Sequence, residues 1–272
     1  VALAADVAEI VAVEIDPVIQ SIGTWMHPAD PYGSDQVRVE IEDARRYLRT
    51  APEQFDAIIF SHLDSHTLLG GYTNVRLDNY IYTIESFRSA RDLLTENGWV
   101  YVSFWAERDW IVERFHRNLT EAFGHEPLTV VRDVETPAGT VILSQFLISR
   151  VPLGKDFIED KYPGWETYRF GLDPGDQTPV STDDWPFLYI HQRRVPLLVI
   201  LLSTVLVLGA ILFLGRSLRG RVGINGHFFF LGAAFLLLEF HNLSRLALLF
   251  GTTWWVNTWV IAAIIVTILL AN

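Results

Sequence analysis

The sequence predicts an α/β fold, with a doubly wound and mostly parallel sheet, followed by transmembrane helices. Strand-like and helix-like patterns alternate over residues 1–150, which is typical of a parallel sheet covered by helices on both faces. Two later runs of 20 residues, 196–215 and 252–271, carry no charge, and that length matches the apolar core of a bilayer. The segment between these parts, 151–195, is predicted to be a linker or docking segment.

Six strands are expected in the first domain, because short apolar and β-branched runs lie between turn residues. They are predicted at 10–14, 37–42, 55–61, 98–104, 127–134 and 139–149. The turn around Pro137 that joins the last two strands is too short for a helical crossover. These two strands are therefore expected to pair antiparallel.

Helices are expected between the strands. They are predicted at 2–8, 17–22, 43–49, 83–96 and 107–123. Thr83 with Ser86 is typical of a helix start, and Asn97 with Gly98 is typical of a helix end, because both residues tolerate a left-handed backbone.

The region from 196 to 272 is predicted to hold three transmembrane helices, at about 196–215, 226–250 and 252–271. Charge inside a membrane span is costly and is commonly paired or functional. Glu239 and Arg245 in the second span therefore have two interpretations, an ion pair between helices or a substrate or ion path. The sequence predicts a multi-pass membrane protein with the lipid bilayer as a partner, and arginines on both sides of the first span leave its orientation open.

Charge and composition restrict the function classes. Residues 1–190 hold 31 Asp and Glu against 15 Lys and Arg, which argues against nucleic acid as a partner. The acidic surface suits a cationic substrate such as an amine, although it is also a common solubilising device. The chain has no cysteine, so disulfides and thiolate metal sites are excluded.

Acidic residues follow the first two predicted strands. Glu14 and Asp16 end the first strand just before Pro17. In open α/β sheets, ligands lie beyond the carboxyl ends of the strands, and an acid there can accept from both hydroxyls of a ribose. Asp43 follows the next strand and is placed to accept from an adenine amine. Two solvated carboxylates on turns are the alternative interpretation.

At this point the chain resembles a known family, the polyamine aminopropyltransferases (spermidine and spermine synthases), which share the class I S-adenosylmethionine-dependent methyltransferase fold. The matching segments are 13–17, 42–48, 55–60, 82–87, 93–94 and 97–98. The sequence is most similar to membrane-fused members of that family. The segments that carry this closer resemblance are 63–68, 75–78, 82–83, 182–189, 237–239 and 248–252.

The resemblance implies S-adenosylmethionine or its decarboxylated form as co-substrate. The cofactor-binding residues that it implies are Glu14, Asp16, Asp43, Ala44 and Ser61. The implied catalytic residues are His62, Asp64, His66 and Tyr82. Ser61 stands where the family has an aspartate that handles the attacking amine, and a hydroxyl cannot take a proton as a carboxylate does.

Three functions follow from this resemblance. The first is aminopropyl transfer to an amine, the second is methyl transfer, and the third is a non-catalytic membrane sensor or transport-associated module. The domain at 1–150 is expected in the cytoplasm, where the cofactor is made. The family's first strand and Gly-rich loop should precede Val1, so the chain alone is expected to be inactive and to bind no S-adenosylmethionine measurably.

Two further motifs have alternative interpretations. The spacing of His62, Asp64 and His66 permits a zinc site, but a loop with substrate-facing or solvated histidines is favoured, and no metal is predicted. Asp183 and Asp184 precede the first predicted span. They are interpreted either as a lid or amine-binding pair, or as part of a turn that docks neighbouring aromatic residues on the domain.

Overall fold

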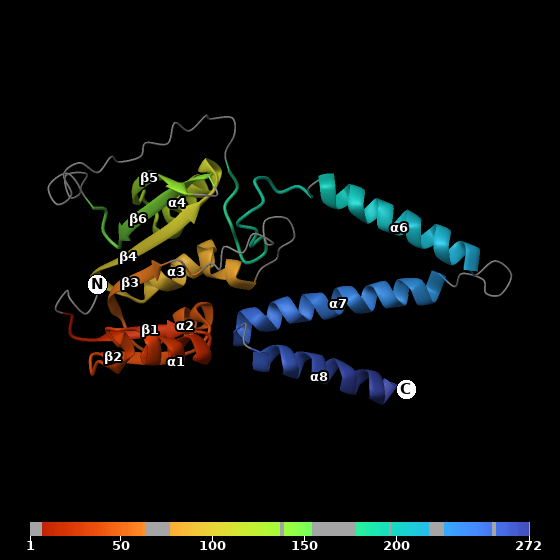
Figure 1. Cartoon of the computed structure of the whole chain (residues 1–272), viewed down its shortest axis with the longest axis horizontal. Helices are drawn as coiled ribbons and strands as arrows, with labels where there is room; N and C mark the ends of the chain where they lie inside the picture. Colours follow the sequence, from red (N-terminus) through yellow and green to blue (C-terminus); the bar gives the residue numbers. More distant parts are fainter. Residues whose placement is uncertain are drawn as a thin grey trace. The chain divides into compact units, whose positions relative to one another are not determined.

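The fold is mixed α/β in its first part and helical in its last part (Figure 1). The structure is a computed structural model that describes residues 7–61, 63, 77–136, 139–153, 178–195, 197–217, 226–251 and 254–271. The chain divides into two compact units, residues 1–191 with 243–272, and residues 192–242.

The described elements of the α/β part follow one another in the predicted order, and most of the helix predicted at 2–8 lies outside the described residues. The first five are β1 (Ile10–Glu14), α1 (Pro17–Met26), the 3-10 turn η2 (Pro31–Gly33), β2 (Val37–Ile41) and α2 (Ala44–Thr50). The next four are β3 (Phe55–Ser61), the 3-10 turn η3 (Leu77–Tyr82), α3 (Ile84–Asp92) and β4 (Leu94–Ala106). The last three are α4 (Asp109–Phe123), β5 (Leu128–Thr136) and β6 (Gly139–Ser149).

The described strands form two sheets. β1 and β2 pair parallel, and the second sheet has the order β3-β4-β6-β5. Within the second sheet β3 and β4 are parallel, whereas β4 with β6 and β5 with β6 are antiparallel. The predicted antiparallel pairing of the last two strands is therefore confirmed. β1 and β3 share no backbone pairing among the described residues.

The core lies between one face of the second sheet and helices α3 and α4. Alternate residues of β4, from Val100 to Ala106, are fully buried, as expected for a strand with one face on a core. The ring of Phe115 from α4 stacks on Phe146 from β6, with centroids 5.7 Å apart. α4 ends at Gly124, whose φ of +84° is the left-handed C-terminal conformation that glycine adopts without steric cost.

The predicted helix at 83–96 is shorter in the structure, and its end signal has another role. α3 ends at Asp92 and β4 begins at Leu94, so Asn97 and Gly98 lie inside a strand. A Cβ atom at Gly98 would lie 2.9 Å from the carbonyl oxygen of Phe55. Gly98 therefore allows β3 to approach β4 closely, which is a known reason for glycine within a strand.

Residues 178–191, which we call the strap, dock on the α/β part. Thr182 and Trp185 form an isolated antiparallel bridge, and Leu188 is fully buried. The guanidinium of Arg114 on α4 lies 5.0 Å from the centre of the Trp185 ring. This arrangement supports the docking interpretation of the segment.

The last three described helices are α6 (Leu197–Ser217), α7 (Gly226–Phe250) and α8 (Trp254–Ala271). The prediction that they are transmembrane helices of a multi-pass membrane protein is contradicted. Within the described ranges, none of these helices is both long enough and apolar enough to cross a bilayer.

The structure also places the two charges that the sequence assigned to the second span. α7 contains Glu239 and Arg245. Arg245 forms an ion pair with Asp184 and not with Glu239. The distance from Arg245 Nη2 to Asp184 Oδ1 is 3.9 Å.

Candidate cofactor site at the strand ends

The ends of β1 and β2 lie side by side, as the sequence predicts. Glu14 is in register with Ile41, and the backbone N–H of Glu42 donates to the carbonyl of Glu14 at 3.0 Å. The half-buried Glu14 carboxylate accepts from the N–H of Asp16 through Oε1 at 3.0 Å. Among the described residues, no hydrogen bond is made to its Oε2, so one carboxylate oxygen can accept from a ligand.

Asp16 has a clear structural role. Its carboxylate accepts from the N–H of Val18 at 2.8 Å and caps α1, whose first helical residue is Pro17. Aspartate before proline at a helix start satisfies one of the free N–H groups that a helix leaves there. The carboxylate of Asp16 is therefore already engaged within its own turn.

Asp43 caps α2 in the same way. Its Oδ1 accepts from the N–H of Arg46 at 2.9 Å, and the residue is only 8% exposed. A Cβ atom at Gly251 would lie 2.7 Å from the Cβ of Asp43, so the backbone after α7 covers Asp43 on one side. Ala44 follows as the first residue of α2 and lies partly buried against the core.

Of the remaining predicted site residues, the structure describes Ser61 and Tyr82 and places them in different surroundings. Ser61 is exposed at the end of β3, in register with Ser103 of β4. Tyr82 is 1% exposed, and its ring makes edge contacts with Phe104 and Phe115 at centroid distances of 5.5 and 5.0 Å. Tyr82 therefore lies in the aromatic core. The other three, His62, Asp64 and His66, lie outside the described residues.

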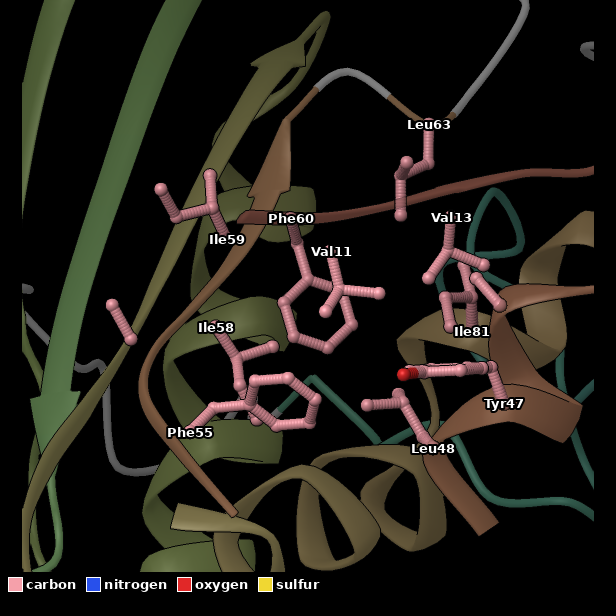
Figure 2. A pocket seen from close by; sticks show the side chains of 12 residues that line it. Val11, Val13, Tyr47, Leu48, Phe55, Ile58, Ile59, Phe60, Leu63 and Ile81 are labelled. Carbon is pink, nitrogen blue, oxygen red and sulfur yellow. The ribbon is translucent and has the colours of Figure 1, made fainter. Parts of the chain in front are cut away.

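A mainly apolar pocket of about 150 Å³ lies between β1, β3 and α2 (Figure 2). Its walls are Val11, Val13, Ala44, Tyr47, Leu48, Phe55, Ala57, Ile58, Ile59, Phe60, Leu63 and Ile81. Successive side chains of a strand point to opposite faces. Because consecutive residues 57–60 all line the pocket, it follows the edge of β3 rather than either face. Its position, between strands that do not pair, could not be read from the sequence.

Tyr47 brings a polar group to this pocket. Its hydroxyl donates to Glu53 Oε1 at 2.9 Å, and burial together with this bond raises the pKa of Tyr47 to about 12. Glu53 also accepts from the guanidinium of Arg38, and these bonds hold the pKa of the Glu53 carboxyl below its usual value. The cluster fixes α2 to β2 and keeps the tyrosine protonated at neutral pH.

Asp183 of the strap reaches the start of α2, a contact that the sequence did not indicate. Its Oδ2 accepts from Arg45 Nη2 at 3.0 Å, and its Oδ1 accepts from Thr83 Oγ1 at 2.8 Å. Its backbone N–H donates to Glu85 Oε2 at 2.9 Å. Burial, together with the charge of Asp183, raises the pKa of Tyr80 in the same region. Asp184, in contrast, has a side chain that is 92% exposed.

Neither a protein-family model nor a curated protein matches this sequence. Among solved structures, it is similar to spermidine synthase from Thermotoga maritima, with 15% identity and a TM-score of 0.42, over 60% of this chain and 54% of that one. It is also similar to a probable spermidine synthase from Corynebacterium glutamicum, with 16% identity and a TM-score of 0.40, over 60% and 63% of the two chains.

A third similar structure is human methyltransferase-like protein 13 in complex with SAH, with 22% identity and a TM-score of 0.39, over 56% of this chain and 67% of that one. The chain spans little more than half the length of the Thermotoga spermidine synthase. Substrate and reaction must therefore be argued from the residues of this chain.

Proposed function

We propose that this chain belongs to an S-adenosylmethionine-dependent transferase that moves an aminopropyl group to an amine. The observation that supports this proposal is the adjacency of the ends of β1 and β2, which places Glu14 and Asp43 on neighbouring strand ends. A carboxylate with one available oxygen in that position suits the two hydroxyls of a ribose. Asp43 and Ala44, at the start of α2, suit the edge of an adenine.

The proposed reaction needs positioning and one proton acceptor. The amine nitrogen attacks the carbon beside the sulfonium, the carbon–sulfur bond breaks, and its electron pair remains on sulfur as a neutral thioether. The ammonium that forms gives its proton to a base. Positioning the two reactants accounts for much of such a rate enhancement. The proposed bases are His62, Asp64 and His66.

Methyl transfer is the second candidate, because Ser61 weakens the case for aminopropyl transfer without establishing another reaction. The hydroxyl of Ser61 lies exposed at the end of β3, where a synthase is expected to carry a carboxylate for the ammonium of its substrate. A neutral hydroxyl holds a cationic amine less firmly than a carboxylate does. The two reactions differ in the nucleoside that they release, so product analysis separates them.

The test is mass spectrometry of the full-length protein incubated with either form of the cofactor and a panel of diamines. Methylthioadenosine supports aminopropyl transfer, and S-adenosylhomocysteine supports methyl transfer. Glu14→Gln is expected to lower the yield of either product at least tenfold. The matched control is Glu96→Gln, an exposed carboxylate at the start of β4 in the other sheet. Release of neither nucleoside by the unaltered full-length protein would overturn the proposal.

A further inference from the structure

The strap connects the proposed nucleoside site to the start of α3 through one carboxylate. Asp183 binds Arg45 and Thr83 with its two oxygens, at 3.0 and 2.8 Å. Arg45 is 6% exposed and lies two residues after Asp43. Its guanidinium also donates to Ser89 Oγ at 3.1 Å. Asp183 therefore links the first turn of α2 to the first turns of α3.

The position of α2 depends on such contacts, because the helix has only seven residues. Helices of that length are not stable alone and take their position from tertiary packing. Two arginines of the first turn have a charged partner: Arg45 pairs with Asp183, and the more exposed Arg46 pairs with Glu42. Arg45 is the buried one, and a buried guanidinium that loses its carboxylate is strongly unfavourable. Movement of Arg45 would shift the turn that begins with Asp43 and Ala44.

From this geometry we infer that Asp183 is a positioning residue for the adenine side of the proposed nucleoside site, acting through Arg45 on Asp43 and Ala44. The inference rests on the proposed function, because it concerns the same site. Asp183 does not itself touch the nucleoside in this role. Its removal loosens the start of α2 and weakens nucleoside binding.

Other residues hold the strap without touching α2, so the two effects can be separated. Glu113 on α4 accepts from the N–H and the hydroxyl of Thr178, at 3.3 and 2.6 Å. Asn118 on the same helix accepts from the N–H of Ser181 at 3.0 Å. Glu113→Gln therefore weakens the strap at its other end and provides a matched control for Asp183→Asn.

The experiment measures the affinity of the full-length protein for methylthioadenosine by calorimetry, and the exchange rate of the Arg46 amide by NMR. The Arg46 amide is the right probe because it donates to Asp43 Oδ1. Asp183→Asn is expected to weaken binding about tenfold and to speed this exchange about tenfold. Glu113→Gln is expected to change both by less than twofold, while both variants lower the melting temperature.

Two outcomes overturn the inference. One is an equal loss of affinity and protection in Glu113→Gln, which would show that Asp183 only stabilises the strap. The other is an unchanged Arg46 amide in Asp183→Asn. If Asp183→Asn does not fold, Arg45→Lys replaces it, because a lysine loses the forked contact with Asp183 and Ser89 but keeps the charge. Arg45→Lys is then expected to weaken nucleoside binding and to speed exchange of the Arg46 amide more than Glu113→Gln does.

If the proposed function is wrong, these measurements give a different result from the one expected if only the role of Asp183 is wrong. If the unaltered protein binds no methylthioadenosine, the nucleoside site itself is absent and the role of Asp183 toward a ligand falls with it. The exchange measurement would still report whether Asp183 holds the start of α2. Normal binding by the unaltered protein, with no difference between Asp183→Asn and Glu113→Gln, would contradict the role of Asp183 alone.

Discussion

Arg114 donates a hydrogen bond to the carbonyl of Leu188 at 2.5 Å, across 74 positions of the chain. The same guanidinium donates to four further carbonyls of the strap, those of Pro179, Phe187, Ile190 and His191. The side chain is fully buried, and its charge is balanced by carbonyl dipoles and by the faces of Trp110 and Trp185. Arg114 therefore holds the strap to α4 through five carbonyls, in addition to the bonds that Glu113 and Asn118 make.

Replacing Arg114 by lysine is expected to lower the free energy of unfolding by about 3 kcal/mol, because an ammonium leaves several buried carbonyls without a donor. Urea unfolding followed by tryptophan fluorescence measures this change. The control is Arg88→Lys, at a surface pair with Glu121 of 3.7 Å, with an expected effect below about 0.5 kcal/mol. A loss below about 1 kcal/mol for Arg114→Lys would contradict the assigned role.

Gly251 and Gly124 form a matched pair for a second prediction. Both have positive φ angles, +88° and +84°, but only at Gly251 would a Cβ atom meet a neighbour, the Cβ of Asp43 at 2.7 Å. Gly124→Ala should cost about 1 kcal/mol for the left-handed backbone alone. Gly251→Ala should cost at least about 1 kcal/mol more, because overpacking adds to it. Equal losses in thermal unfolding would show that Asp43 is not covered by this turn.

The cap at the start of α1 gives a third prediction. Asp16→Ala removes the acceptor for the N–H of Val18 and is expected to cost about 1 kcal/mol, whereas Asp16→Asn keeps a good cap and should cost only a few tenths of that. Chemical denaturation compares the two variants. If Asp16→Asn is as unstable as Asp16→Ala, the carboxylate charge rather than the cap is what stabilises this turn.

Because of Tyr47, we expect the protein to lose stability at alkaline pH. Its pKa is about 12 in the folded protein, against about 10 in an unfolded chain. The folded state therefore favours the protonated tyrosine. Its contribution is complete below about pH 10 and is lost as the pH rises toward 12. Relative to Tyr47→Phe, the unaltered protein should lose urea resistance over this range. Parallel pH profiles of the two proteins would contradict the prediction.

Local sequence patterns located most of the elements of the first domain. The strands predicted at 10–14, 55–61 and 139–149 have the same bounds in the structure, because alternation and turn residues act over a few positions. The end of α3 was missed, since Asn97 and Gly98 are a helix end signal by type but serve a close strand contact. A glycine has more than one structural use, and only its neighbours show which one applies.

Only part of the candidate site could be predicted from the sequence. The acids that follow strands, Glu14 and Asp43, could be predicted because strand ends are marked locally. The family resemblance implies a catalytic role for Tyr82, but the structure places its ring among core aromatics. The pocket along the edge of β3 and the contacts of Asp183 join residues that are distant in sequence. No periodicity encodes such pairs.

By itself, the sequence determined the α/β order of elements, the acids at neighbouring strand ends and the antiparallel final hairpin, because each depends on short-range periodicity or on loop length. The tertiary structure decided the separation of β1 and β3 into two sheets, the burial of Arg114 beneath the strap and the link from Asp183 to α2. It also corrected the transmembrane prediction. The reason is physical: a hydropathy pattern measures composition along the chain, whereas burial and pairing depend on residues that only folding brings together.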